Sequence, residues 1–497
     1  MSSDFRADDD DARYLALQAR DARFDGRFFT GVTSTGIYCR PVCAVRTPRR
    51  ENCRFFALAA QAESAGFRPC LRCRPELAPQ AAPWSVQDAS SILVRQALRL
   101  LDAPEAWGEP EGGPLVAQLA ARLGISDRHL RRIFEAALGI SPLQYLQTRR
   151  LLTAKQLLTD TRLPVTQVAL ASGFASVRRF NAAFCAHYGL NPTQLRRQGA
   201  LPDAGEGGHP VRLGYRPPLD AAALLGFFAA RRIQGLEEVE GLALRRTVRL
   251  AHAGMVYTGW LQARFDPARA QLLLLVSDGL QPVLAPLIAR VRALLDLDAD
   301  PQAINAVLHP FFPRGDGLRV PGALDGFELA VRAVLGQQVT VAAARTLAER
   351  LVARFGAPVE TPWPGLHRLF PTPAAMAAAE GDALGRLGIV HQRQAAIVAL
   401  ARAVDQGRLP LHASSDLDTT TAALRQLPGI GDWTAQYIAM RALRWPDAFP
   451  AGDVALHKAL GVQGLRQPAR AAAEAAQAWR PWRSYGVIRA WAELSNK

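Results

Sequence analysis

Apolar residues recur at helical spacing over two long stretches of the chain, one ending near residue 198 and one beginning after residue 324. Between these stretches, residues 242–250, 255–265 and 271–276 are β-branched or alternate between apolar and polar, which predicts three strands. The longest aliphatic run, residues 272–276, has the length of a strand, whereas a membrane span needs roughly 20 apolar residues. The pattern therefore predicts helical and strand-rich domains and no membrane segment.

Breaks rich in proline and glycine divide the chain. Residues 76–83 and 198–210 are predicted linkers, and residues 103–114 form a loop near the start of the first helical stretch. At ordinary domain sizes, 497 residues are enough for three or four domains. We expect domains at residues 1–78, 84–198, 211–320 and 321–497, with a linker at 199–210. The expected fold class is multidomain α+β: a small α/β domain, an all-α domain, an antiparallel β-sheet/α subdomain and a second all-α domain.

The first helical stretch contains an internal repeat. Residues 119–134 and 168–184 each follow the order helix, glycine turn, serine, second helix, in which the serine is a typical helix N-cap. A long helix near residues 143–158 joins the two units. Each second helix carries an apolar stripe at helical spacing, formed by Leu130, Ile133, Phe134 and Ala137 in the first unit and by Phe180, Ala183, Phe184 and His187 in the second.

The balance of charge suggests a partner. The formal net charge is +15, with an isoelectric point near 10.3 and mostly arginine as the source of positive charge. Arginine favours bidentate contacts with phosphate, so nucleic acid is the expected partner, although an acidic protein or a membrane surface would also fit the charge. Residues 1–13 are acidic and lack the apolar core of a secretory signal, so we expect a cytoplasmic protein.

Four of the six cysteines form two close pairs. Cys39 and Cys43 are separated by three residues, and Cys70 and Cys73 by two. Two such pairs can complete a tetrahedral thiolate site for Zn²⁺, and a purely structural zinc is the simplest interpretation of the spacing. Outside this pattern, Cys53 and Cys185 are expected to be small buried residues.

The sequence around these cysteines resembles the N-terminal domain of the Ada adaptive-response proteins. The similarity covers about residues 10–78 and rests on residues 24–28, 35–43, 51–52 and 65–73. It implies that the zinc thiolate of Cys39 attacks a methyl phosphotriester in DNA and keeps the methyl group irreversibly. A zinc-bound thiolate stays nucleophilic at neutral pH, and its conversion to a neutral thioether would strengthen binding to DNA.

The repeated helical units resemble the AraC-type DNA-binding domain, over about residues 85–198. The matching motifs are residues 119–134, 139–142, 167–184 and 188–193. The resemblance implies that the second helix of each unit enters the major groove, where arginine and asparagine can read guanine and adenine. The alternative is that these side chains contact phosphate or solvate the helix. The outward side chains are Arg128, His129, Arg131, Arg132, Ser176, Arg178, Arg179 and Asn181.

A glycine-rich turn and a lone acid stand out in the second helical stretch. In residues 427–435, Gly429 and Gly431 flank Ile430 in a turn that we expect to be too tight for side chains. Backbone amides at the following helix start can hold a phosphate. Asp453 presents a carboxylate at a later helix start, where a plain N-cap is the simplest interpretation.

From about residue 212 onward, the chain resembles the AlkA branch of the helix-hairpin-helix glycosylases, the 3-methyladenine DNA glycosylase II type. The matching motifs are residues 324–328, 335–340, 427–437, 449–453 and 482–491. The resemblance implies that Asp453 stabilises the oxocarbenium-like state and that Trp433, Tyr437 and Trp491 line the pocket of a flipped base. Gln338 stands where some relatives carry an apolar wedge that fills the space left in the duplex by the flipped base. The resemblance therefore does not decide whether Gln338 fills this space. Trp479 and Trp482 are expected to pack in the core.

Two absences narrow this expectation. Relatives that also cut the backbone carry a lysine just after the hairpin, where this chain has Trp433, so a monofunctional glycosylase is expected. No cysteine follows Cys185, so we expect no iron–sulfur cluster and no methylguanine methyltransferase domain. A monovalent cation at the hairpin is a further candidate ligand.

Together these features predict a monomeric fusion of a methyl phosphotriester sensor, a DNA-binding regulator and an alkylpurine glycosylase. The expected partners are double-stranded DNA, both alkylated and promoter DNA, and RNA polymerase. Two alternatives remain: a regulator whose glycosylase fold only binds DNA, and a glycosylase whose zinc and helix-turn-helix domains are a passive DNA clamp.

Overall fold

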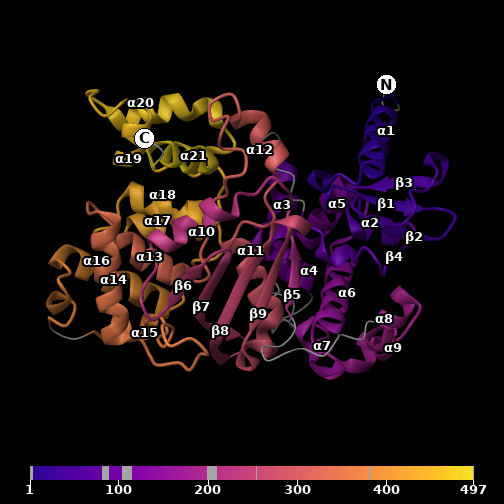
Figure 1. The fold of residues 1–497 in the computed structure, drawn as a ribbon, viewed down its shortest axis with the longest axis horizontal. Coiled ribbons are helices and arrows are strands. Elements are labelled where there is room, and N and C mark those ends of the chain that lie inside the picture. Colours follow the sequence, from indigo (N-terminus) through magenta and orange to yellow (C-terminus); the bar gives the residue numbers. More distant parts are fainter. Residues whose placement is uncertain are drawn as a thin grey trace.

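The computed structural model describes residues 4–80, 89–102, 115–198, 210–252, 254–379 and 382–495. Figure 1 shows a central sheet with the N-terminal domains on one side (indigo to magenta) and the C-terminal helices on the other (orange to yellow). The predicted fold class, multidomain α+β, is confirmed. The predicted loop at residues 103–114, most of the predicted linker at 198–210 and residues 81–83 lie outside the described residues.

The N-terminal domain is built on a small sheet. Its strands are β1 (Phe29–Val32), β2 (Ile37–Cys39), β3 (Cys53–Phe56) and β4 (Arg68–Pro69), in the order β3-β1-β2-β4. Helices α1 (Asp4–Gln18) and α2 (Ala59–Ser64) complete the domain. Strand β2 pairs in parallel with β4, so Tyr38 lies opposite Pro69. This register brings Cys39, the last residue of β2, and Cys70, the residue after β4, to the same end of the sheet.

The internal repeat is confirmed. The helices are α3 (Ala89–Asp102), α4 (Leu115–Arg122), α5 (Asp127–Leu138), α6 (Pro142–Asp160), α7 (Val165–Ala171), α8 (Val177–Tyr188) and α9 (Pro192–Gln198). Ser126 and Ser176 cap α5 and α8, where each hydroxyl accepts a hydrogen bond from the backbone amide three residues on. Of the first predicted stripe, Leu130, Ile133 and Phe134 are buried, but Ala137 is exposed. The prediction for Ala137 was wrong because α5 turns this position away from the core at its C-terminal end.

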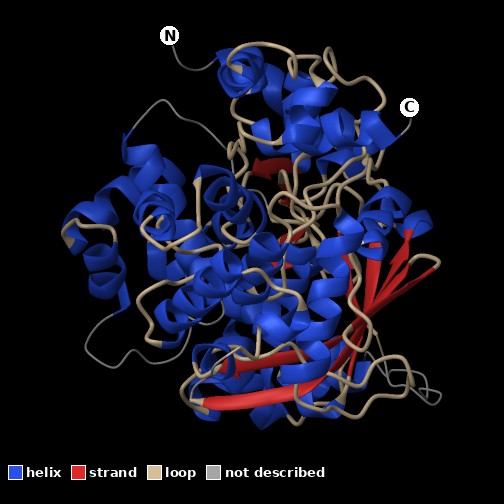
Figure 2. Ribbon diagram, turned by 90° about the vertical axis from the view of Figure 1, so that its left-hand side faces the viewer, coloured by secondary structure: helices blue, strands red, loops and turns tan. Residues whose placement is uncertain are grey.

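The strand-rich subdomain holds a five-stranded antiparallel sheet. The strands are β5 (Val211–Gly214), β6 (Glu237–Glu240), β7 (Ala243–His252), β8 (Met255–Asp266) and β9 (Gln271–Val276), in the order β5-β9-β8-β7-β6. Figure 2 shows that the sheet is strongly twisted and that helices pack along it. The three predicted strands are confirmed as β7, β8 and β9. The two edge strands were not predicted because four residues are too few to show alternation. Helices α10 (Ala221–Ala230), α11 (Leu284–Leu294) and α12 (Pro301–Leu308) belong to this part.

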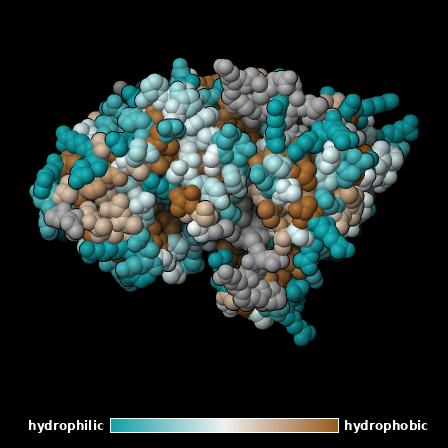
Figure 3. Space-filling model, turned by 90° about the horizontal axis from the view of Figure 1, so that it is seen from below, coloured by the Kyte–Doolittle hydropathy of each residue, from teal (hydrophilic) through white to brown (hydrophobic). Residues whose placement is uncertain are grey.

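The C-terminal domain is helical, as predicted. Its helices are α13 (Gly326–Leu335), α14 (Val341–Phe355), α15 (Pro373–Ala377), α16 (His391–Asp405), α17 (Leu417–Arg425), α18 (Asp432–Arg441), α19 (Val454–Ala459), α20 (Pro468–Ala475) and α21 (Arg483–Ser495). Trp479 is buried and Trp482 packs partly buried against the same cluster, which confirms their predicted place in the core. None of the described helices has the length and apolar character to cross a membrane. On the face shown in Figure 3, apolar areas are scattered among hydrophilic side chains.

The structure corrects part of the first predicted linker, residues 76–83. Residues 76–80 are packed rather than solvated, and the Glu76 carboxylate is buried between Lys155 Nζ at 2.7 Å and Arg74 Nε at 2.9 Å. Burial would raise the pKa of Glu76, but the charges of Lys155 and Arg74 lower it below its usual value. The proline-rich composition of this segment predicted a linker. The prediction missed the packing because Glu76 pairs with a lysine some 80 positions away, and local sequence does not show such a contact.

The domains also share interior contacts. One hydrophobic cluster runs from the second helix-turn-helix unit, including Phe180 and Phe184, into the sheet at Leu244 and Leu261. Among the described residues, the guanidinium of Arg216, which is 1% exposed, donates hydrogen bonds to backbone carbonyls alone. The acceptors are those of Asp25, Pro79, Gln80, Asp298 and Ala299, at 2.7–3.1 Å. A single side chain therefore joins the N-terminal domain, its connecting segment and the strand-rich subdomain.

We expect Arg216→Ala to lower the free energy of unfolding by about 3 kcal/mol or more, because it leaves buried carbonyl oxygens of three segments without a hydrogen-bond donor. Chemical denaturation followed by circular dichroism measures the change. Arg269→Ala is the matched control, because that side chain is 76% exposed and forms a surface ion pair with Asp266. The control should change stability by less than about 0.5 kcal/mol. Equal effects of the two substitutions would contradict the structural role of Arg216.

Candidate functional site

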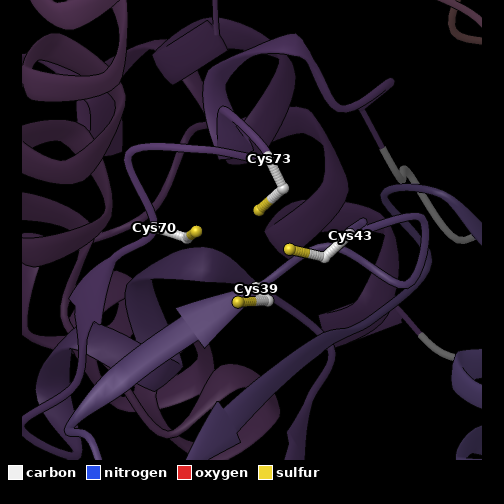
Figure 4. A group of neighbouring side chains, drawn as sticks. All are labelled: Cys39, Cys43, Cys70 and Cys73. Carbon is white, nitrogen blue, oxygen red and sulfur yellow. The ribbon is translucent and has the colours of Figure 1, made fainter. Parts of the chain in front are cut away.

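The four paired cysteines converge at the end of the small sheet. Cys39 ends β2 and Cys70 follows β4, while Cys43 and Cys73 lie in the turns that come next. Their four Sγ atoms all lie within 4.8 Å of one another, and Figure 4 shows them pointing toward a common centre. A tetrahedral Zn²⁺ with bonds of about 2.3 Å places its sulfurs roughly 3.8 Å apart, so the cluster fits this ion. The predicted zinc ligands are confirmed as one cluster.

Surrounding polar groups support this cluster. The backbone amide of Arg40 donates to Cys73 Sγ at 3.4 Å, and buried Lys155 of α6 donates to the Cys70 carbonyl at 3.1 Å. The Arg40 side chain pairs with buried Asp25. Cys39 is 6% exposed, whereas Cys73 is the most exposed of the four ligands. Exposure alone would favour Cys73 as the reactive thiolate, so the choice of Cys39 rests on the resemblance to Ada.

The two remaining cysteines differ from each other. Cys53 is buried and its Sγ donates to the Arg49 carbonyl at 3.3 Å, as expected of a small core residue. Cys185 is exposed on α8, so the prediction that it is buried was wrong. The prediction rested on residue type alone, whereas the buried side of α8 is formed by Phe180, Phe184 and Tyr188.

Removing zinc is expected to release one metal ion per chain and to lower the melting temperature, because the metal would no longer join the four cysteines and β4 would lose its anchor. Chelation under reducing conditions, with a metal-sensitive dye and a thermal scan, measures both quantities. Cys185→Ser is the matched control and should keep one zinc per chain. A Cys43→Ser variant that bound zinc as tightly as the wild type would rule out the cluster as the site.

The predicted DNA-reading side chains lie on the outer faces of α5 and α8. Exposed positions are Arg128, Arg132, Arg178, Arg179 and Asn181, while His129 and Arg131 are half-buried. Arg132 Nη2 lies 3.1 Å from His129 Nδ1, and Arg131 pairs loosely with Asp127 at 3.9 Å. These weak local contacts leave the guanidinium groups able to bind a ligand.

The predicted hairpin joins α17 to α18. Gly429 has a φ of +74°, and a Cβ there would lie 3.1 Å from the Cβ of Ala396, so this position requires glycine. A Cβ at Gly431 would meet no atom within 4 Å, so the expectation of a turn too tight for side chains is wrong there. Gly431 instead leaves open space before the first amides of α18. Gln337 Nε2 donates to the Gly429 carbonyl at 2.8 Å and to Thr434 at 2.9 Å, which ties the hairpin to the Gln338 loop.

The predicted glycosylase residues converge on one cavity. Its volume is about 1290 Å³, and it lies between α10 of the strand-rich subdomain and the helices of the C-terminal domain. Its lining includes every base-pocket and hairpin residue predicted from sequence: Gln338, Gly429, Gly431, Trp433, Tyr437, Asp453 and Trp491. Gln338 is exposed at this cavity and has a left-handed φ of +54°, a strain typical of functional loops.

The Asp453 carboxylate is held from three sides. Its Oδ1 accepts from the Leu456 amide at 2.7 Å and from Trp491 Nε1 at 3.0 Å, while Oδ2 accepts from Trp433 Nε1 at 2.9 Å. The side chain is 8% exposed. Asp453 is therefore an N-cap, as the simplest interpretation held, and it also faces the cavity. The two indole donors keep the carboxylate oriented without neutralising it.

Aromatic rings form the walls beside this carboxylate. Trp433 and Tyr437 are stacked, with ring centroids 5.2 Å apart and an interplanar angle of 17°, and Trp491 lies 6.4 Å from Tyr437. Electron-rich ring faces around a carboxylate attract a planar cation. The sequence did not reveal Phe227, Arg231, Arg441 or Lys458, which also line the cavity. The available signal for the first two was an aromatic residue and an arginine four positions apart, Phe227 on α10 and Arg231 directly after it.

Known families match four consecutive parts of the chain. Residues 12–76 match the metal binding domain of Ada, and residues 119–198 match a helix-turn-helix domain. Residues 210–325 match the AlkA N-terminal domain, and residues 331–484 match the HhH-GPD superfamily of base excision DNA repair proteins.

Whole proteins are similar as well. A probable bifunctional transcriptional activator/DNA repair enzyme AlkA of Mycobacterium tuberculosis is 39% identical over 98% of this chain and 97% of its own length. DNA-3-methyladenine glycosylase 2 of Escherichia coli is 36% identical over 56% of this chain and 95% of its own. The bifunctional transcriptional activator/DNA repair enzyme Ada of the same organism is 34% identical over 38% of this chain and half of its own.

Proposed function

The chain belongs to the family of bifunctional transcriptional activator/DNA repair enzymes that join an Ada-type zinc domain and a helix-turn-helix region to an AlkA-type glycosylase, and we propose how its residues divide the work. It is a DNA-3-methyladenine glycosylase fused to a DNA-binding regulator with one zinc site. The observation that carries the assignment of residues is Asp453, whose two carboxylate oxygens are held by indole donors inside an aromatic cavity.

In the proposed reaction, an alkylated purine leaves the duplex and stacks against Trp433, Tyr437 and Trp491. Alkylation at N3 or N7 makes the base cationic, so it can depart with the electrons of the glycosidic bond and become neutral without an acid. Asp453 stabilises the positive charge that develops on the sugar and orients the attacking water. The residue just after the hairpin is Trp433, whose indole donates a hydrogen bond to Asp453. A tryptophan has no amine that could form an imine with the sugar. We therefore propose base excision without strand cutting.

The hairpin is proposed to hold the DNA backbone. The open space at Gly431 admits a phosphate to the amides that begin α18, where the helix dipole favours negative charge. A monovalent cation bound by the carbonyl oxygens of the hairpin would also attract this phosphate. Gln338, exposed on a loop tied to the hairpin by Gln337, is positioned to fill the space left by the flipped base.

The N-terminal half is proposed to sense the same damage. Zinc, when bound, keeps the cysteine thiolates deprotonated at neutral pH. The Cys39 sulfur then forms a bond to the methyl carbon of a phosphotriester, the carbon–oxygen bond breaks, and the phosphodiester leaves as an anion. Arginine and asparagine side chains on α5 and α8 read promoter DNA in the major groove, and RNA polymerase is the partner of activation. We propose that the protein acts as a monomer in the cytoplasm.

Release of free base from methylated duplex DNA tests the enzymatic part. We expect the full chain to liberate 3-methyladenine, which chromatography detects, and to leave the strands intact until the abasic sites are cleaved by alkali. Unmethylated duplex is the control. Tight binding to methylated DNA without base release would favour the alternative in which the glycosylase fold only binds DNA.

A further inference from the structure

The loop that presents Gln338 to the cavity combines a free side chain with a constrained backbone. The loop runs over residues 336–340, from the end of α13 to Thr340, whose hydroxyl caps α14. Gln338 is exposed, and within the described part of the chain its side chain makes no hydrogen bond. Its φ of +54° is left-handed, and a residue other than glycine keeps such a backbone only where its surroundings impose it. The residues next to Gln338 must therefore supply the constraint.

The side chain of Gln337 joins this loop to two parts of the glycosylase domain at once. Its Nε2 donates to the Gly429 carbonyl of the hairpin at 2.8 Å and to the hydroxyl oxygen of Thr434 at 2.9 Å. Thr434 is 2% exposed and lies in α18, directly after Trp433. One amide group therefore contacts both the turn that is proposed to hold the DNA backbone and the helix that carries two rings of the base pocket.

The main chain of Gln337 is held by α16. The guanidinium of Arg393 donates to the Gln337 carbonyl, which belongs to the peptide group that enters Gln338. The same helix packs against the hairpin, since a Cβ at Gly429 would lie 3.3 Å from the carbonyl oxygen of Gln392. The peptide group before Gln338 is thus fixed at its oxygen by α16, while the preceding side chain is fixed to the hairpin and α18. These contacts leave the Gln338 side chain as the free part of the loop.

We propose that Gln337 is a positioning residue that holds Gln338 for entry into the duplex and so helps a paired base to leave its stack. Gln337 acts through Gln338 in this role and takes no part in breaking the glycosidic bond. The inference rests on the proposed function, in which Gln338 fills the space left by the flipped base. A base without a pairing partner costs less to extrude, so the contribution of Gln337 should be large for a paired lesion and small for an unpaired one.

The test uses two duplexes of the same sequence with one 7-methylguanine each, which faces cytosine in the first and a stable abasic analogue in the second. The measured quantity is the ratio of the single-turnover rates of base release, paired over unpaired. We expect Gln337→Glu to lower this ratio about tenfold, because the carboxylate keeps the size of the side chain but cannot donate to the Gly429 carbonyl. The fluorescence of 2-aminopurine placed beside the paired lesion should report less unstacking in this variant than in the wild type.

A double-mutant cycle shows whether Gln337 acts through Gln338. Gln338→Ala alone should also lower the ratio, and adding Gln337→Glu should lower it no further, because the side chain that is positioned is already absent. Independent effects that multiply in the double variant would overturn the inference. An equal loss of release from both duplexes in Gln337→Glu would also overturn it, since that result is expected of a purely structural residue.

Gln394→Glu is the matched control, because it removes the same kind of hydrogen bond elsewhere in the domain. Gln394 Nε2 donates to the Ile389 carbonyl at 2.7 Å, and the residue lies in α16 outside the lining of the cavity. This variant should keep the wild-type ratio. A lowered ratio in Gln338→Ala beside an unchanged one in Gln337→Glu would overturn the inference alone. An unchanged ratio in Gln338→Ala would overturn the proposed role of Gln338 as well, and a wild type that releases no 7-methylguanine would overturn the proposed function itself.

Discussion

Asp453→Asn is expected to lower the rate of 3-methyladenine excision roughly 10³-fold, equivalent to about 4 kcal/mol of transition-state stabilisation. The carboxylate is the only acidic side chain hydrogen-bonded to both pocket indoles among the described residues. An amide is neutral, so it cannot offset the charge that develops on the sugar. Single-turnover base release from methylated duplex measures the rate.

The same substitution has a predictable side effect on stability. Asparagine can still cap α19 through its oxygen, but its amide nitrogen would face the N–H of Trp433, where Oδ2 now accepts at 2.9 Å. Two opposed donors should cost about 1–2 kcal/mol of folding free energy. Adding Trp433→Phe to Asp453→Asn removes the opposed donor, so it should recover stability without recovering activity.

Asp416→Asn is the matched control for capping. Asp416 caps α17, accepting from the Thr419 amide at 2.8 Å, and it does not line the cavity. This variant should retain wild-type excision. If Asp453→Asn excised 3-methyladenine at the wild-type rate, the carboxylate would be only a helix cap and the proposed mechanism would be wrong.

Methyl phosphotriester DNA is expected to transfer one methyl group to Cys39, and Cys39→Ala should abolish the transfer completely. The reason is chemical, because an alanine leaves no sulfur to form the bond and the other three thiolates retain their roles as ligands. Intact-protein mass spectrometry counts the methyl groups, and fragmentation of the peptides assigns the residue.

The assignment to Cys39 is a sharp test because Cys73 is the more exposed ligand. Methylation found on Cys73 would move the reactive site to the second pair. Cys185→Ser controls for simple alkylation of an exposed thiol, and it should leave the single transfer unchanged. Absence of any added methyl group would favour a structural zinc in a passive DNA clamp.

Local patterns predicted the elements well where a residue's neighbours in sequence decide its structure. The serine caps at Ser126 and Ser176 and the glycine turns between paired helices predicted both helix-turn-helix units, because capping involves residues only three positions apart. The alternation in β7 to β9 predicted the central strands for the same reason. Local patterns did not predict the four-residue edge strands or the packing of the segment at Glu76, because partners far away in the sequence stabilise both.

The candidate sites show the same division. Spacing paired Cys39 with Cys43 and Cys70 with Cys73, but the parallel register of β2 and β4 unites the pairs. Motif resemblance identified Asp453 and the pocket aromatics, yet it could not reveal that Trp433 and Trp491 donate to the two oxygens of that acid. Arg231 and Arg441 entered the pocket only through the packing of α10 against α18.

The sequence by itself therefore determined the helical and strand-rich parts and the two cysteine pairs, because residue types at short spacing encode them, and its resemblance to known families supplied the pocket residues. The tertiary structure alone decided how the domains join at Arg216, which side chains hold Asp453, and which charges surround the base. Those properties depend on contacts between residues some 20 to 275 positions apart, such as Trp433 with Asp453 and Arg27 with Gln302. Chain folding brings such residues together through the burial of shared apolar surface, which no local pattern records.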